Sequence, residues 1–97
     1  MSDSIRVRDI IRERREELGL SQVQLSRFLR IVSSEFVCLV ESGKRSFALD
    51  NLPVVADVLG LDAADLCRCG LYEATPRLYL ATFGGAPPDR PKPVMRR

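Results

Sequence analysis

Apolar side chains recur at helical spacing along the first two thirds of the chain. In the first such segment, Val7, Ile10, Ile11 and Leu18 are interleaved with arginines and glutamates, which is typical of an amphipathic helix. No strand-like alternation of apolar and polar residues occurs before residue 77. The segments that we expect to be helical are, approximately, 5–18, 22–29, 34–41, 51–59 and 63–69.

Residues that favour helix starts and helix ends separate these segments. Ser21 and Asp62 can each accept a hydrogen bond from the first turn of the helix that follows, and Asp50 or Asn51 can do so for the fourth helix. Glycine tolerates the left-handed conformation that commonly ends a helix. The glycines expected to end helices are Gly19, Gly43, Gly60 and Gly70. Short helices separated in this way predict a compact all-α domain.

The segment TPRLYLATF, residues 75–83, is compatible with two structures. Thr75 as a cap and Pro76 in the first turn favour a helix, which is our prediction. The alternation of side chains from Leu78 to Phe83 also fits a strand, so this alternative stays open.

The chain after Gly84 has no pattern that would build a core. Residues 84–97 contain four of the six prolines and four basic residues. We expect them to form a disordered, partly polyproline tail. The predicted organisation is therefore a domain at 1–70, an extension at 71–83 and a Pro-rich basic tail at 84–97.

Composition narrows the functional classes. A chain of 97 residues corresponds to one domain. No apolar run approaches the roughly 20 residues that span a bilayer, and the N-terminus lacks a signal-peptide pattern, so we expect a cytoplasmic protein without membrane contact. The net charge is only +2, but five of the fifteen basic residues lie between Arg6 and Arg15. Such a cluster can attract phosphates or simply be a solvated helix face.

The chain has few residues that could form a catalytic or metal-binding site. The chain has no histidine, and its three cysteines, Cys38, Cys67 and Cys69, are an odd number with no metal-binding spacing. We see no nucleophile with a neighbouring base and no glycine-rich phosphate loop. We therefore expect neither an enzyme nor a metal or other cofactor, and we expect the cysteines to be structural or incidental.

Three motifs together resemble a known family. LGLSQ begins at Leu18, E-x-G-K-R begins at Glu41, and L-x-x-x-A-x-x-L-G-L begins at Leu52. In this combination, residues 5–66 resemble the Cro/C1-type helix-turn-helix family, also called the xenobiotic-response-element type. The resemblance implies a five-helix bundle whose second and third helices form a DNA-reading unit.

The resemblance also implies roles for individual residues. It pairs Arg15 with Glu41 across the bundle as a structural ion pair. It implies that Gln22, at the start of the second helix, hydrogen-bonds a DNA phosphate. Lys44 and Arg45, on the loop after the third helix, are suited to phosphate contacts, although they could also be a solvated basic loop.

The predicted reading face departs from the family pattern. Between Leu25 and Glu41 the chain is one residue longer than usual, and the turn RIVSS lacks the common glycine. Side chains with strong purine-reading chemistry are missing from this face, so we expect readout through weaker contacts, water or DNA shape. Arg30 could supply a base contact from the turn; alternatively, Phe36 and Leu39 belong to a protein-binding surface. The expected base-reading residues are Ser33, Ser34, Glu35, Cys38, Leu39 and Arg30.

We therefore expect a sequence-specific transcriptional regulator, a repressor that binds double-stranded DNA at a two-fold operator as a homodimer. The alternative is a protein-interaction module, such as an antitoxin-like subunit, that retains the fold. Large apolar residues beyond the five-helix unit favour a dimer contact, unless residues 71–83 fold back on their own bundle as a sixth helix. The residues assigned to the dimer contact are Leu71, Tyr72, Leu78, Tyr79, Leu80 and Phe83.

Overall fold

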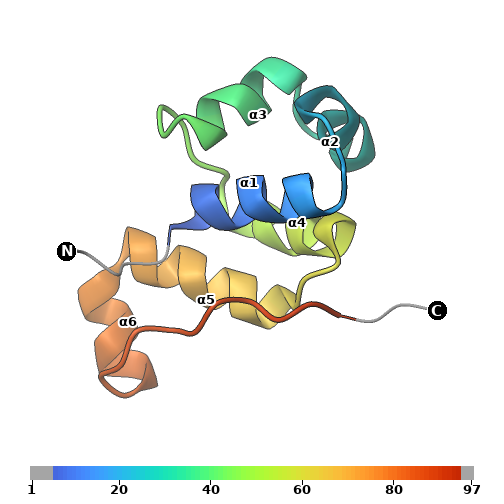
Figure 1. Cartoon of the computed structure of the whole chain (residues 1–97). Coiled ribbons are helices and arrows are strands. Elements are labelled where there is room, and N and C mark those ends of the chain that lie inside the picture. Colours follow the sequence, from blue (N-terminus) through green and yellow to red (C-terminus); the bar gives the residue numbers. More distant parts are fainter. Residues whose placement is uncertain (1–5, 95–97) are drawn as a thin grey trace.

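The computed structural model describes residues 6–94 and contains six α-helices and a short 3-10 helix within that range (Figure 1). The five predicted helices are all present, although the predicted start at Ile5 and the last tail residues, 95–97, lie outside the described residues. The elements are α1 Val7–Glu17, α2 Gln22–Leu29, α3 Ser34–Glu41, η1 Leu49–Asn51, α4 Leu52–Leu59, α5 Ala63–Ala74 and α6 Pro76–Phe83.

The helices share one apolar core. In Figure 1, α2 and α3 lie together at one end, α1 and α4 lie in the middle, and α5 and α6 lie at the other end. Each of the first five helices contributes at least one fully buried side chain to this core. Among these side chains are Ile11, Leu25, Val37, Val55 and Leu66. The core therefore holds α2 and α3 firmly on the α1–α4 layer.

Side-chain caps mark the starts of α2, α3 and α5, whereas the cap expected from Asp50 or Asn51 is wrong, because α4 begins without a side-chain cap hydrogen bond. The Ser21 hydroxyl oxygen accepts from the Gln24 backbone N–H (3.0 Å), and the Gln24 side-chain oxygen accepts from the Ser21 N–H (2.8 Å). Ser33 caps α3 and Asp62 caps α5 through the same spacing of three residues. Each cap satisfies a backbone N–H that the first turn leaves without a helical partner.

The prediction that Gly70 ends the fifth helix is wrong. Helix α5 continues to Ala74, and Gly70 is a buried residue within it. A Cβ atom at this position would collide with Cδ1 of Leu52 and lie 3.2 Å from Cδ2 of Leu49. Gly70 therefore allows α5 to approach the start of α4 closely, and the expected domain boundary at residue 70 falls inside a helix.

Residues 76–83 are helical, as predicted, and they fold back on the bundle. Thr75 does not cap α6 with its side chain; its hydroxyl instead donates to the Leu71 carbonyl (2.9 Å). The Tyr79 ring packs edge-on against Tyr72 (5.4 Å between centroids) and also contacts Phe83 (4.7 Å). The assignment of Tyr79 to a dimer contact is wrong, because only 5% of this residue is exposed in the single chain.

The expected disorder of the tail is also wrong for residues 89–94. The Val94 N–H donates to the Gly60 carbonyl (2.8 Å), and the Asp62 N–H donates to the Lys92 carbonyl (2.9 Å). The two terminal guanidinium nitrogens of Arg90, Nη1 and Nη2, donate to Oε1 and Oε2 of Glu13, each over 3.0 Å. In Figure 1 this segment runs along α5. Backbone groups at the α4–α5 connection, which no apolar pattern reveals, hold it there.

Candidate nucleic-acid interface

Helices α2 and α3 are joined by a four-residue turn, 30–33, with an unusual backbone at its first residue. Arg30 has φ +63°, the left-handed conformation, and its N–H donates to the Ser26 carbonyl (3.0 Å). Within residues 6–94, no other non-glycine residue has a positive φ. The absence of the family's glycine is thus accommodated by strain at Arg30, whose side chain is exposed.

The inner faces of α2 and α3 are closely packed. Ser26 is buried where the helices meet, and its hydroxyl donates to the Val23 carbonyl (2.7 Å). Phe36 packs edge-on against Phe47, with 5.5 Å between ring centroids. Because Phe36 packs against the core, it is a poor candidate for a protein-binding surface. Such a surface was the alternative to base reading for Phe36 and Leu39.

The expected base-reading residues do not share one environment. Glu35 and Cys38 are exposed on α3, whereas Ser34 and Leu39 are half-buried. The Ser33 oxygen accepts from the Phe36 N–H (3.2 Å) as the α3 cap, although its O–H can still donate. The outward face of α3 is therefore small and carries a single charge, that of Glu35.

Arg15 and Glu41 form the ion pair that the family resemblance implies. Arg15 Nε lies 2.8 Å from Glu41 Oε2, and Arg15 Nη2 lies 2.9 Å from Glu41 Oε1. The Arg15 side chain is 12% exposed and that of Glu41 is 4% exposed. The hydrogen bond to Glu41 raises the pKa of Arg15 above its ordinary value. This pair ties α1 to the end of α3.

Gln22 is part of the same network. Its side-chain Nε2 donates to Glu41 Oε1 (3.1 Å), and the residue is half-buried at the first turn of α2. An amide nitrogen carries two hydrogens, so one remains to donate to another acceptor. The network thus holds Gln22 in place beside the N-terminus of α2.

The loop after α3 carries two exposed cations, Lys44 and Arg45, and its Gly43 packs against the Arg8 side chain. The backbone N–H groups of Lys44 and Arg45 both donate to the Leu39 carbonyl (2.9 and 3.2 Å). Gly43 has φ +85°, and the Arg8 guanidinium lies where a Cβ atom at position 43 would be. Both observations require glycine at this position. Sequence reasoning missed Arg8, because nothing in the basic cluster between Arg6 and Arg15 distinguishes it from its neighbours.

Several cations around this end of the molecule have no carboxylate partner. The ion pairs within residues 6–94 use other arginines, on α1, on α5 and in the tail. The basic residues left without an ion pair in this part of the chain include Arg6, Arg8, Arg27, Arg30, Lys44 and Arg45. Unpaired cations close to α2 and α3 favour a polyanionic partner.

The cysteines lie in three different environments. Cys38 is exposed, Cys67 is half-buried and Cys69 is buried. Burial raises the pKa of the Cys69 thiol to about 11, and its Sγ lies 3.4 Å from the Asp89 carbonyl oxygen. The described residues contain no cluster of three or more potential metal ligands. Nor does that part of the chain have a helix long and apolar enough to cross a membrane.

Comparison with known proteins gives one match. A family model described as helix-turn-helix matches residues 11–66, which include α2, the turn and α3. No curated protein and no solved structure shows significant similarity to the chain.

Proposed function

Because the chain belongs to the Cro/C1-type helix-turn-helix family, whose members bind DNA, we propose that it is a sequence-specific transcriptional regulator acting inside the cell. The observation that carries this proposal is the α2–turn–α3 unit, packed on the core and surrounded by unpaired cations. A rigid reading unit and a positively charged rim are the two elements that docking on a duplex requires.

Phosphate contacts position the protein in this proposal. Lys44 and Arg45 are exposed on a loop whose backbone is anchored to α3, so their charges can reach a phosphate without reordering the chain. Gln22 contributes its remaining amide N–H beside the N-terminus of α2, where the helix dipole favours an anion.

Base contacts in this proposal come from α3 and the turn before it. Glu35 can accept from the amino group of cytosine, and Cys38 can contact the methyl group of thymine. Ser33, Ser34 and Leu39 add weak contacts at the edges of this face. Arg30 supplies the one side chain with purine-reading chemistry, and DNA shape supplies part of the specificity.

A homodimer on a two-fold operator, acting as a repressor, completes the proposal. On α6, Leu78 (63% exposed) and Phe83 (52% exposed) remain available for a contact between copies, and the half-buried Leu80 of α6 and Leu71 and Tyr72 of α5 complete the proposed contact. A two-fold dimer would place its two reading helices about 34 Å apart, one turn of DNA.

A second candidate function is a protein-binding module that retains the fold. Phe28 and Ile31, at the end of α2 and in the turn, are 60% and 46% exposed. Exposed apolar side chains next to a weak base-reading face are compatible with a protein partner at this surface.

Selection from random-sequence DNA distinguishes the two candidates. For a regulator, we expect enrichment of a two-fold site. Lys44→Ala and Arg45→Ala should each weaken binding to all sequences and lower the slope of log affinity against log salt by roughly one unit. Gln22→Ala should weaken binding but leave the slope unchanged, because it removes no charge.

Arg68→Ala is the matched control for the cation variants. Arg68 is a half-exposed arginine on α5, in the layer opposite α2 and α3 (Figure 1). Its loss should change neither affinity nor slope. An equal effect of Arg68→Ala would contradict the proposed docking face, and failure to enrich any sequence would contradict the regulator and favour the protein-binding module.

A further inference from the structure

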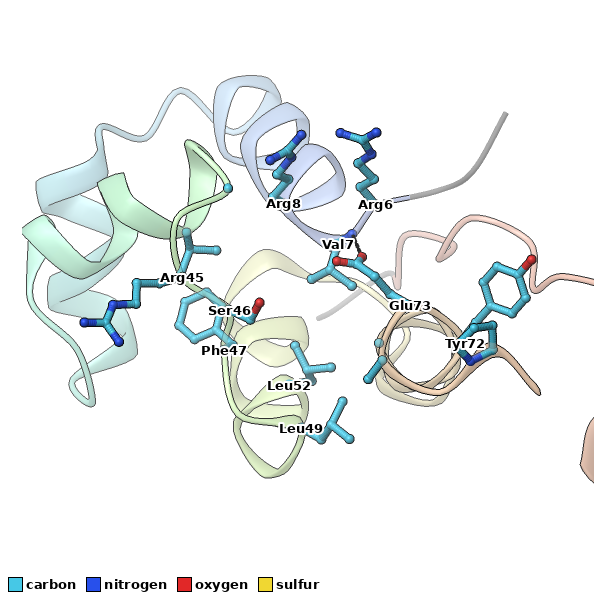
Figure 2. Close-up of a pocket in the computed structure, with 15 residues that line it drawn as sticks. Arg6, Val7, Arg8, Arg45, Ser46, Phe47, Leu49, Leu52, Tyr72 and Glu73 are labelled. Carbon is cyan, nitrogen blue, oxygen red and sulfur yellow. Dashed lines mark hydrogen bonds between the residues drawn. The ribbon is translucent and has the colours of Figure 1, made fainter. Parts of the chain in front are cut away.

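Two cations at the start of α1 are separate from the loop that carries Lys44 and Arg45. Arg6 and Arg8 lie at the edge of a pocket of about 650 Å³, where the start of α1, residues 43–49 and the end of α5 meet (Figure 2). Figure 2 shows both side chains extending from α1 away from the apolar side chains of that pocket. Their guanidinium groups are therefore placed to contact a surface outside the protein and not a ligand inside the pocket.

No carboxylate of the described residues compensates these two charges. Neither Arg6 nor Arg8 forms an ion pair within residues 6–94. Asp9, the acidic residue next to them in the sequence, pairs with Arg12 instead (3.7 Å). Like charges held near each other repel, and a bound anion would remove that repulsion.

The start of α1 is held in place by a residue of α5. Arg6, the N-cap residue, provides no side-chain cap, and the Val7 N–H instead donates to Glu73 Oε2 (2.8 Å). The Glu73 carboxylate thus lies at the positive end of the α1 dipole, which offsets its charge. Because this contact orders the backbone that carries Arg6 and Arg8, an anion can bind them without paying to order it.

Arg8 also connects the start of α1 to the docking loop. Its guanidinium lies where a Cβ atom of Gly43 would be, directly before Lys44 and Arg45 in the sequence. Arg8 and Arg45 nevertheless extend in different directions (Figure 2). The two groups of cations are therefore neighbours on one rigid body that cannot converge on a single phosphate.

We propose that Arg6 and Arg8 form a second DNA-backbone site, which binds a phosphate other than those held by Lys44 and Arg45; this inference rests on the proposed function. Guanidinium groups bind phosphate through charge-assisted hydrogen bonds, often two at once. A duplex offers many phosphates on one surface, so it can engage both divergent groups of cations, whereas a small anion can engage only one. Such a contact fixes the orientation of the protein without reading bases.

Binding of the full chain to a duplex of arbitrary sequence, several helical turns long, tests the site over a range of salt concentrations. Arg6→Gln and Arg8→Gln should each weaken binding roughly tenfold at low salt and lower the slope of log affinity against log salt by roughly one unit. The effects of Arg8→Gln and Lys44→Ala should add, because different phosphates are lost.

Two control variants separate a phosphate contact from other effects. Arg68→Gln removes the same charge from α5, in the layer opposite α2 and α3, and should change neither affinity nor slope. Arg8→Lys keeps the charge beside Gly43 and should retain the slope, whereas a purely structural role of the guanidinium would not separate it from Arg8→Gln. The free energy of unfolding should be the same for Arg6→Gln, Arg8→Gln and the unaltered chain.

Single neutral methylphosphonate groups, placed along the operator that selection enriches, locate the contacts. One position should weaken the unaltered chain but not Arg8→Gln, and a different position should weaken the unaltered chain but not Lys44→Ala. Unchanged slopes for Arg6→Gln and Arg8→Gln, or one position shared with Lys44→Ala, would overturn this site and leave the proposed regulator intact. Reduced slopes on arbitrary DNA without enrichment of any sequence would support the site and contradict the sequence-specific regulator.

Discussion

At the scale of single residues, Glu41 is a buried carboxylate that depends on two partners, Arg15 and Gln22. Removing one charge of a buried pair leaves the other without compensation. We expect Glu41→Ala to lower the free energy of unfolding by about 3–5 kcal/mol in urea denaturation. Glu16→Ala, an exposed change on α1, should cost less than about 0.5 kcal/mol. Equal, small losses from both would contradict a buried pair.

Arg30 is a second residue whose backbone predicts a measurable effect. An L-amino acid pays roughly 1–2 kcal/mol in the left-handed conformation, whereas glycine does not. We expect Arg30→Gly to stabilise the protein by about 0.5–1 kcal/mol, after allowing for the extra freedom of glycine in the unfolded chain. Arg27→Gly, inside α2, should instead destabilise by about 1 kcal/mol. Thermal unfolding of both variants measures this, and a lower melting temperature for Arg30→Gly would argue against strain at the turn.

At the scale of elements, the tail segment 89–94 covers Cys69 on α5. Alkylation requires the thiolate, and with a pKa of about 11 only roughly one Cys69 thiol in a thousand is ionised at pH 8. We expect iodoacetamide to label exposed Cys38 first and Cys69 last, as followed by mass spectrometry. Deleting residues 86–97 should speed Cys69 labelling at least tenfold, because it removes the Asp89 carbonyl that lies against the thiol and opens that side of Cys69 to the reagent.

Cys38 serves as an internal control in that experiment, since it lies on α3, away from the tail, and its rate should not change. Unaltered Cys69 labelling in the deletion variant would show that the tail does not protect α5 in solution.

At the scale of the whole molecule, the proposed homodimer can be tested at the surface through which it would form. Truncation after residue 70 would cut α5, so substitutions are the better test. We expect Leu78→Lys combined with Phe83→Lys to convert a dimer into a monomer in sedimentation at micromolar concentration, because a contact through α6 cannot bury two charges. Phe28→Lys, an equally exposed position on α2, should leave the dimer intact. Dissociation by Phe28→Lys alone would place the interface at α2, and a monomeric unaltered chain would remove the dimer.

Local signals account for what the sequence determined by itself. Ser21 and Asp62 start their helices as expected, because each cap needs only a backbone N–H three residues ahead. The cap expected from Asp50 or Asn51 is absent. The helices follow apolar periodicity, which depends on neighbouring residues alone. Even the Arg15–Glu41 pair can be expected from the sequence, although only because a family motif supplies the long-range contact.

The tertiary structure decided everything that depends on residues distant in the sequence. Gly70 looks like a helix end, but close packing against Leu52 makes it an interior residue of α5. The tail looks disordered, yet backbone groups of Gly60 and Asp62, thirty or more positions earlier, give it hydrogen-bond partners. The pocket is assembled from three segments, and no local pattern marks Arg8 as part of it. Periodicity and capping describe one stretch of chain at a time, whereas these features exist only once separate stretches have packed together.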